Sequence, residues 1–383
     1  MNGVLTLNAG SSSLKFGLYD DTVDATLRVG GQVDGIGRTP QLVLQTEDNS
    51  TTTPCSAQTH RDALAAVLDA LAPYLEGLTI AGIGHRVVHG GPDFSDPVRV
   101  TPEIEAALTD LVPLAPLHQP HNLAGIAAAR DLFPDAVQVA CFDTAFHRGH
   151  PWVNDTFALP RRFYEDGIRR YGFHGLSYDY ITGVIARDEP ELHAGRIIIA
   201  HLGNGASMCA VQRGQSIGST MGFSALDGLP MGTRCGQIDP GAVLHLIEQK
   251  GMTPKEVLSL LYTESGLLGL SGISSDMREL LASDRSEARE AIDYYVFRAR
   301  REIGALSAVL GGLDALVFCG GIGENADIIR RSIVDGLEYL GLSIDTDAPA
   351  GSRDIGSGAT RILVIPTDEE RIMARATVSA CSD

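Results

Sequence analysis

The chain has 383 residues, of which 44% are hydrophobic, and a formal net charge of -18. Its length is typical of about two domains, and its 43 glycines indicate an α/β protein with many tight turns. The acidic balance disfavours nucleic acid as a partner, because binding DNA or RNA needs a positive stripe and the arginines here are scattered.

The first predicted element is a hairpin. Residues 4–7 are mostly apolar, a small polar stretch follows, and Leu14, Phe16 and Leu18 alternate on the return strand. The polar groups at the bend are an amide, three hydroxyls and an ammonium, from Asn8, Ser11, Ser12, Ser13 and Lys15. Such groups beside a glycine suit a phosphate or a metal on a phosphate, although an ordinary serine-rich turn is the alternative.

The rest of the first half alternates strand and helix patterns. Residues 20–54 predict further antiparallel strands at a sheet edge. The spacing then predicts, in order, a helix over 60–76, a strand over 80–88, a helix over 104–112 opened by Pro102, a helix over 123–132 capped by Asn122, and a strand over 136–142. We expect the domain boundary near residues 145–151.

The second half repeats the opening layout. A helix over 178–187 precedes an apolar strand (197–202), the small turn GNGAS and a return strand (208–212). Two such hairpins predict a duplicated fold whose phosphate loops face each other across a cleft. Residues 216–241 are glycine-rich and predict a binding loop. The remaining predictions are helices over 242–249, 255–262, 286–310, 327–340 and 368–380, with strands over 313–319 and 361–365.

The cysteines and the hydropathy bear on location. The six cysteines include no CxxC pair, so we expect reduced thiols. The N-terminus resembles no signal peptide, and no uncharged apolar window reaches the length of a membrane span. We therefore expect a soluble cytoplasmic protein with no membrane partner.

Three glycine-rich turns follow apolar strands, at residues 8–13, 203–207 and 320–325. Their backbone N–H groups can converge on an anion, so together they predict a nucleotide-triphosphate site. The sequence contains neither GxGxxG nor GxxxxGK[ST], which makes a Rossmann dehydrogenase and a P-loop NTPase unlikely candidates.

Two arginines stand among glycines, Arg86 in GHRVVHGG and Arg234 in the long glycine-rich loop. An arginine fork matches a carboxylate or a transferring phosphoryl group, whereas surface salt bridges are the alternative. His118, His174 and His201 stand beside glycine or proline in predicted loops, and each could donate to a phosphoryl group or be a structural histidine. Their spacing does not predict a zinc site.

Two carboxylates complete the candidate residues. Asp143 ends a buried strand, where a general base or a magnesium ligand would be held firmly. Glu369 has the same potential, but a helix N-terminal charge explains it equally well.

The motifs NAGSSSLKF, GHRVVHGG, FDTAFH, YGFHG, HLGNGAS, MGTRCGQIDP, GGIGEN and PTDEE occur in this order along nearly the whole chain. In this order and spacing they resemble the acetate kinase family of carboxylate kinases. The resemblance implies the superfold of actin, Hsp70 and sugar kinases: an α/β protein of two duplicated actin-like (ribonuclease H-like) domains with a central cleft. It implies an N-terminal domain (1–147) for the carboxylate, on which the terminal helix (371–383) packs, and a nucleotide-binding domain (148–370).

The resemblance also implies a role for each matched residue. Asn8 and Glu369 would hold Mg²⁺, with Mn²⁺ as an alternative. Arg86 would bind the carboxylate, Asp143 would orient it or link to the metal, and His174 with Arg234 would stabilise the transferring phosphoryl group. The residues that would contact ATP or ADP are Lys15, His201, Leu202, Gly203, Asn204, Gly205, Asp276, Met277, Arg278, Gly321, Ile322, Gly323, Glu324 and Asn325.

The substrate methyl would lie against Val88, Leu117, Phe173 and Ala225. Ala225 departs from the proline that is common in the family, which puts strict acetate selectivity in doubt, and Met277 and Asp368 are milder departures. The expected reaction is reversible transfer of the ATP γ-phosphoryl group to acetate. The alternatives are a propionate or butyrate kinase and, more remotely, a non-kinase ATPase of the superfold. A homodimer is implied by the resemblance alone.

Overall fold

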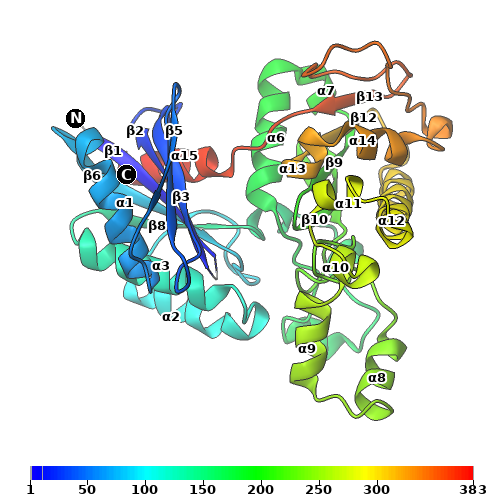
Figure 1. Cartoon of the computed structure of the whole chain (residues 1–383), viewed down its shortest axis with the longest axis horizontal. Helices are drawn as coiled ribbons and strands as arrows, with labels where there is room; N and C mark the ends of the chain where they lie inside the picture. The colour runs from blue at the N-terminus through cyan, green and yellow to red at the C-terminus, as the bar shows by residue number, and fades with distance from the viewer. Residues whose placement is uncertain (1, 11, 383) are drawn as a thin grey trace. The chain divides into compact units, whose positions relative to one another are not determined.

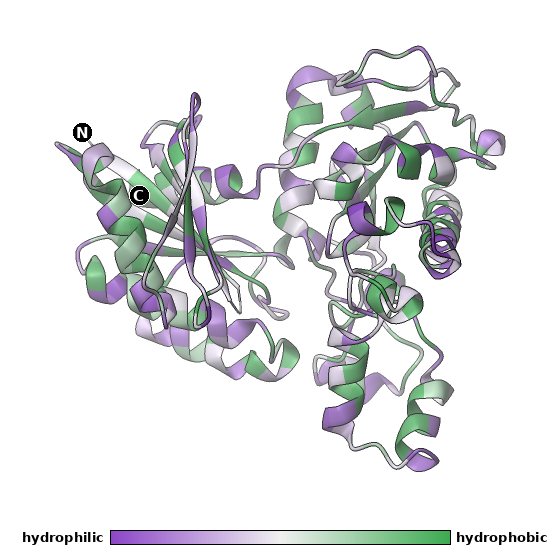
Figure 2. Cartoon of the chain, viewed as in Figure 1, coloured by the Kyte–Doolittle hydropathy of each residue, from purple (hydrophilic) through white to green (hydrophobic). Residues whose placement is uncertain are grey.

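A computed structural model describes residues 2–10 and 12–382, and it divides into two compact units. Unit 1 comprises residues 1–148 and 368–383, and unit 2 comprises residues 149–367. Each unit contains one sheet with helices packed against it (Figure 1). The hydrophobic residues concentrate along the strands of both sheets, as Figure 2 shows.

Unit 1 is built on an eight-stranded sheet of order β5-β4-β3-β2-β1-β6-β8-β7. Its strands are β1 (Asn2–Ala9), β2 (Ser13–Asp20), β3 (Leu27–Asp34), β4 (Gln41–Gln45), β5 (Ser50–Pro54), β6 (Thr79–Val87), β7 (Val98–Arg99) and β8 (Val137–Phe142). Its helices are α1 (His60–Leu75), α2 (Pro102–Asp110), α3 (Gln119–Leu132) and α15 (Glu369–Ser382), with 3₁₀ turns η1 (Val112–Leu114) and η2 (Ala145–His147).

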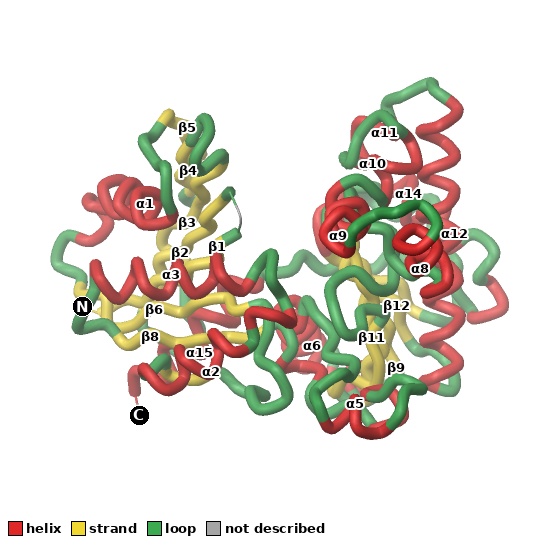
Figure 3. The backbone as a smooth tube through the Cα atoms, turned by 90° about the horizontal axis from the view of Figure 1, so that it is seen from below, coloured by secondary structure: helices red, strands yellow, loops and turns green. Residues whose placement is uncertain are grey.

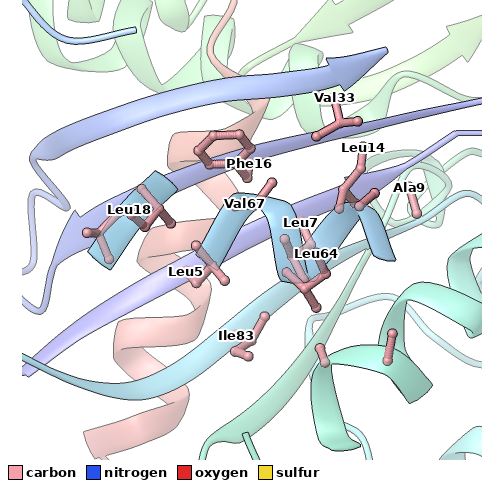
Figure 4. Packing of buried hydrophobic residues seen from close by; sticks show 14 of the residues in the cluster. Leu5, Leu7, Ala9, Leu14, Phe16, Leu18, Val33, Leu64, Val67 and Ile83 are labelled. Carbon is pink, nitrogen blue, oxygen red and sulfur yellow. The ribbon is translucent and has the colours of Figure 1, made fainter. Parts of the chain in front are cut away.

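The alternation of β1 places its side chains in two cores. Leu5 and Leu7 face α1 and α3, where they pack with residues such as Leu64 (Figure 4). Val4 faces the opposite side and packs with Ala374 of α15. Figure 3 shows α1 and α3 on one face of the sheet and α15 on the other. Because both faces are covered, β1 is buried along almost its whole length.

The C-terminal helix α15 packs closely on β6 because that strand offers glycines. A Cβ atom at Gly82 would lie 2.7 Å from Thr377 Cγ2, and one at Gly84 would lie 3.0 Å from the backbone oxygen of Met373. Any larger residue would push the helix away. This close packing brings Glu369, at the start of α15, into the same unit as Asn8.

Unit 2 repeats the arrangement with a five-stranded sheet of order β11-β10-β9-β12-β13. Its strands are β9 (Arg196–Leu202), β10 (Ala206–Gln212), β11 (Gln215–Ser219), β12 (Ala315–Cys319) and β13 (Arg361–Val364). Its helices are α4 (Trp152–Asp155), α5 (Arg161–Glu165), α6 (Gly175–Asp188), α7 (Pro190–His193), α8 (Pro240–Glu248), α9 (Pro254–Thr263), α10 (Gly266–Ser271), α11 (Met277–Leu281), α12 (Ser286–Leu310), α13 (Gly320–Asn325) and α14 (Asp327–Val334), with the 3₁₀ turn η3 (Glu338–Leu340). Figure 1 shows α6 and α12 on opposite sides of this sheet.

The duplication predicted from the two hairpins is confirmed by the strand order. The series β3-β2-β1-β6-β8 in unit 1 corresponds to β11-β10-β9-β12-β13 in unit 2. In both series the first three strands are antiparallel neighbours, and the last three are parallel. The fold is therefore the predicted α/β class with two units of one topology.

Several element predictions were wrong at their ends. Asn122 lies inside the first turns of α3 and does not cap it, because the helix begins at Gln119. The helix predicted over 327–340 stops at Val334, since Gly336 takes a left-handed φ of +86°. The glycine-rich stretch from residue 216 begins as strand β11, and the glycine turn at 320–325 is itself the short helix α13.

Candidate active site

In unit 1, the site begins where β6 and β8 end. Arg86 lies near the end of β6 and Asp143 directly follows β8, so the parallel pairing brings the two together. Arg86 Nε donates to both carboxylate oxygens at 3.0 and 3.1 Å, and Nη2 donates to Oδ2 at 2.6 Å. The Asp143 side chain is only 2% exposed and that of Arg86 is 22% exposed. The carboxylate therefore lies behind the guanidinium, which keeps a solvent-facing surface.

Asn8 and Glu369 border the same guanidinium. Arg86 Nη1 lies 3.5 Å from Asn8 Oδ1 at the end of β1. Burial lowers the pKa of Arg86, but the charges of Asp143, Glu369 and Glu370 outweigh this effect and raise its pKa above the ordinary value. For Glu369 itself, burial raises the pKa, the Arg86 charge opposes this shift, and the Asp143 charge adds to it.

The oxygens around Arg86 are suitable ligands for a hard divalent cation. The candidates are the amide oxygen of Asn8 and the carboxylate of Glu369, with Asp143 nearby. Mg²⁺ prefers such oxygens and is typically held by one or two carboxylates together with substrate phosphates. Among residues 2–10 and 12–382, no group of three or more His, Cys, Asp and Glu side chains forms a metal cage. The donor set fits a Mg²⁺ that is brought in with a phosphate substrate.

The other expected residues of unit 1 lie nearby in the fold. Lys15 faces Asn8 across the β1–β2 hairpin and is exposed, and its charge acts on Glu369. Val88 is buried just after β6, whereas the Leu117 side chain is 39% exposed. Ser12 belongs to the turn, Ser13 begins β2, and Ser11 lies outside the described residues.

In unit 2, the candidate residues His174 and His201 form a stacked pair. Their ring centroids lie 4.3 Å apart at an interplanar angle of 20°. His174 Nδ1 lies 2.8 Å from Ser207 Oγ, and His201 Nδ1 lies 2.8 Å from Ser177 Oγ. These contacts at Nδ1 orient both rings, and Nε2 lies on the edge of each ring that faces away from the serine. His201 lies on strand β9, so its prediction as a loop residue was wrong.

His174 has an unusual backbone, because it precedes helix α6 with a left-handed φ of +58°. Few residues other than glycine adopt this conformation, and it is a feature of functional sites. It turns the imidazole toward the β9–β10 hairpin: a Cβ atom at Gly205 would lie 3.3 Å from His174 Nε2 and 3.9 Å from Arg234 Nη1. His174, Gly205 and Arg234 are therefore close neighbours.

Arg234 lies in a loop whose backbone is held by helices α9 and α10. Its Nη1 donates to the carbonyl of Ala225 at 3.2 Å, which links the two residues singled out in the glycine-rich loop. The N–H groups of Ser265 and Leu267 donate to the carbonyls of Thr233 and Met231 at 3.0 and 2.9 Å. The backbone around Arg234 is thus tied to the start of α10.

A cavity of about 850 Å³ lies beside this loop, wholly within unit 2. It is lined by Gly203, Asn204, Ser275, Asp276, Met277, Arg278, Leu281, Gly321, Ile322, Asn325, Ala326, Asp327 and Ile328. Eight of these belong to the expected nucleotide residues, while Ser275, Leu281, Ala326, Asp327 and Ile328 had no motif to mark them. The volume is large enough for a purine nucleoside with phosphates.

Three other expected nucleotide residues, Leu202, Gly323 and Glu324, belong to the same unit but do not line the cavity. Leu202 and Gly323 are buried in the core. Glu324 Oε1 accepts from the N–H groups of Gly320 at 2.8 Å and Thr367 at 3.2 Å, so it holds the start of α13 and the segment that leads to α15. Phe173 is buried in unit 2 and therefore belongs to a different unit from Val88.

The comparisons agree with these observations. The model of the acetokinase family matches residues 3–375. An acetate kinase from Methylocella silvestris is 50% identical over 98% of this chain and 97% of its own length. The crystal structure of the Porphyromonas gingivalis acetate kinase covers 99% of both chains with a TM-score of 0.88 and 35% identity. That of a propionate kinase from Francisella tularensis subsp. tularensis covers 98% of this chain and 99% of its own with a TM-score of 0.92 and 36% identity. The chain belongs to the acetokinase family.

Proposed function

We propose that this protein transfers the γ-phosphoryl group of ATP to acetate, reversibly, forming acetyl phosphate and ADP. The observation that carries the proposal is the position of Arg86, whose guanidinium lies over the buried Asp143 carboxylate and keeps a solvent-facing surface. In a chain with a net charge of -18, such a cation is a selective site for a small anion. The neighbouring Val88 supplies an apolar wall of the kind that a methyl group needs.

The nucleotide is proposed to bind in the cavity of unit 2. Its lining combines apolar side chains such as Ile322 and Met277 with the backbone of two glycine turns, a composition suited to a base and its phosphates. Asn325 Nδ2 donates to the Gly321 carbonyl at 2.9 Å and stabilises one of these turns.

The chemistry follows from the charges of the substrates. A carboxylate is ionised at neutral pH, so it attacks phosphorus without a general base, and Asp143 serves to orient Arg86. Arg234 and His174 donate to the equatorial oxygens, where charge spreads as the phosphoryl group transfers. Mg²⁺, held through Asn8 and Glu369, would neutralise phosphate charge when bound.

An assay that traps acyl phosphates as hydroxamates tests the proposal. We expect ATP- and Mg²⁺-dependent hydroxamate formation from acetate, and replacement of Arg86 by alanine should abolish it. ATP hydrolysis that no carboxylate influences would instead indicate a non-kinase ATPase of the superfold.

A propionate or butyrate kinase is the second candidate, and Ala225 favours it. A Cβ methyl is smaller than a pyrrolidine ring, so Ala225 in place of proline leaves room for a longer chain. One methylene changes kcat/KM by about 10- to 200-fold, so the hydroxamate assay across chain lengths separates the candidates. Ala225→Pro should shift the ratio of kcat/KM values toward acetate.

We also propose a homodimer and a cytoplasmic location. An apolar surface of unit 2 supports the dimer, because Ile238, Leu270, Tyr294 and Phe297 are 37–60% exposed, and three of them border one shallow pocket. All six cysteines are free thiols. No helix in the described ranges is long and apolar enough to cross a membrane. Sedimentation of the native protein and of Phe297→Glu tests the dimer.

A further inference from the structure

Strands β1 and β6 separate just where the carboxylate site begins. Their parallel pairing ends at Leu7 and His85. Beyond this point Asn8 and Ala9 pair only with β2, while Arg86 and Val87 pair with β8. The backbone groups that follow in the two strands therefore need other hydrogen-bond partners.

The side chain of Asn122 fills this gap. It is 3% exposed, its Nδ2 donates to the carbonyl of Ala9 at 2.9 Å, and its Oδ1 accepts from the N–H of Val88 at 3.0 Å. A primary amide carries a donor and an acceptor on two separate atoms, so it can bond to both strands at once. Asn122 thus connects β1 and β6 where the backbone hydrogen bonds between the two strands have ended.

The two groups that Asn122 joins are next to the residues of the proposed site. Ala9 follows Asn8, and Val88 lies two residues after Arg86. The joined strands carry the two side chains that meet at the 3.5 Å contact between Asn8 Oδ1 and Arg86 Nη1. The carbonyl of Gly10 is held in a similar way, because His60 Nε2 of α1 lies 2.6 Å from it. Helix side chains therefore fix the end of β1 on the side where the strand ladder is absent.

We propose that Asn122 is a positioning residue for the carboxylate substrate, a role that rests on the proposed kinase function. It sets the spacing between Asn8, Arg86 and the apolar wall at Val88. When the amide is lost, the buried N–H of Val88 and the carbonyl of Ala9 lose their partners, and the two strand ends move to find others. The guanidinium and the apolar wall then shift relative to each other.

The test is steady-state kinetics of Asn122→Leu, which is nearly isosteric but has neither donor nor acceptor. A displacement of about 1 Å at a reacting group can cost on the order of 100-fold, so we expect kcat/KM for acetate to fall by about 10- to 100-fold. The KM for ATP should change less than the KM for acetate, because the cavity proposed for the nucleotide belongs to unit 2, and among the residues next to Asn122 only Asn8 would act on ATP, through Mg²⁺. The ratio of kcat/KM values for propionate and acetate should also change, because Val88 moves.

Gln138→Met is the matched control. Gln138 is likewise a buried amide with two hydrogen bonds in unit 1, to His85 and to the carbonyl of Ala136, but it lies near the start of β8, five residues before Asp143. Gln138→Met should lower the midpoint of thermal unfolding without changing the ratio of the kcat/KM values for propionate and acetate. Where Asn122→Leu does not fold, Asn122→Ser supplies the same comparison, since its short hydroxyl cannot reach both strands.

Two results would overturn the inference. One is an unchanged ratio of the kcat/KM values for propionate and acetate in the Asn122 variants. The other is an equal fold-change of the KM for acetate and the KM for ATP, as general destabilisation would give. Failure of the proposed function is distinguishable, because the unmodified protein would then form no hydroxamate from any carboxylate.

Discussion

The Arg86 guanidinium and the Asp143 carboxylate form a three-bond fork, with the anion buried and the cation facing outward. Three hydrogen bonds fix the plane of the guanidinium, so Asp143 determines which N–H groups face a substrate.

Asp143→Asn should therefore lower kcat/KM for acetate by about 10²- to 10³-fold, because the substrate-binding guanidinium loses its orientation and its buried partner. The loss should appear in the kinetic constants for acetate, whereas the affinity for ATP should change little. Kinetics at saturating ATP would measure it. Asp131→Asn breaks the exposed pair with Arg61 and should leave the kinetics unchanged. Near-normal turnover of Asp143→Asn would contradict the orienting role.

Arg234→Ala should reduce kcat by about 10³-fold or more, as for other arginines that stabilise a transferring phosphoryl group. The KM for ATP should change little, since Arg234 is absent from the lining of the nucleotide cavity. Single-turnover measurement of acetyl phosphate formation separates chemistry from binding. Arg285→Ala, which removes an exposed pair with Glu287, is a suitable control. Turnover within a few-fold of normal would reject the role of Arg234.

Gly205→Ala tests the crowding between the β9–β10 hairpin and the histidine pair. The added Cβ would lie 3.3 Å from His174 Nε2 and 3.5 Å from its Cε1, so the ring has to shift by a few tenths of an ångström against His201. We expect kcat to fall by about 3- to 10-fold with an intact fold, because the shifted ring is less well aligned with the phosphoryl group. Gly183→Ala in α6 is the matched control, because a Cβ there meets nothing within 4 Å and alanine favours a helix. Equal activity of the two variants would argue against a tightly fixed His174.

Much of this arrangement could be predicted from the sequence, because strand and turn patterns are local. The β1–β2 and β9–β10 hairpins follow from alternation and from small residues at the bends, and helix 286–310 was predicted to the residue. Helix ends were less predictable, since α3 begins three residues before Asn122, the predicted cap.

The site was predictable only through its motifs, because side-chain partners depend on packing between distant segments. Nothing local in the sequence indicates that Ser207 orients His174, or that Asn122 joins Ala9 to Val88. The sequence also does not indicate that Leu281 and Ile328 line the cavity, since apolar residues of helices usually belong to a core. Arg86 and Asp143 were each indicated by a motif at the end of a predicted strand, but their fork depends on the parallel pairing of β6 with β8, which no local pattern indicates.

Two buried histidines should make the stability of the protein depend on pH. Burial lowers the pKa of His85 to about 4, against the effect of its hydrogen bond to Gln138. Burial lowers the pKa of His89 to about 3, and the charge of Arg148 adds to the shift. Both are neutral in the folded protein, whereas in the unfolded chain they bind protons below about pH 6.5.

The free energy of unfolding should therefore be fully retained above about pH 6.5 and should fall as the pH drops toward 4, because only the unfolded chain takes up these protons. Each histidine contributes a slope of up to about 1.4 kcal/mol per pH unit in this range.

Urea denaturation of the native protein and of His85→Asn between pH 8 and pH 5 isolates one contribution. The variant has no group that titrates at this position, so its slope should be smaller by up to about 1.4 kcal/mol per pH unit. His245→Asn, at an exposed histidine of α8, should keep the original slope. An unchanged slope in His85→Asn would mean that His85 carries a proton in the folded protein, in conflict with its burial beside Gln138.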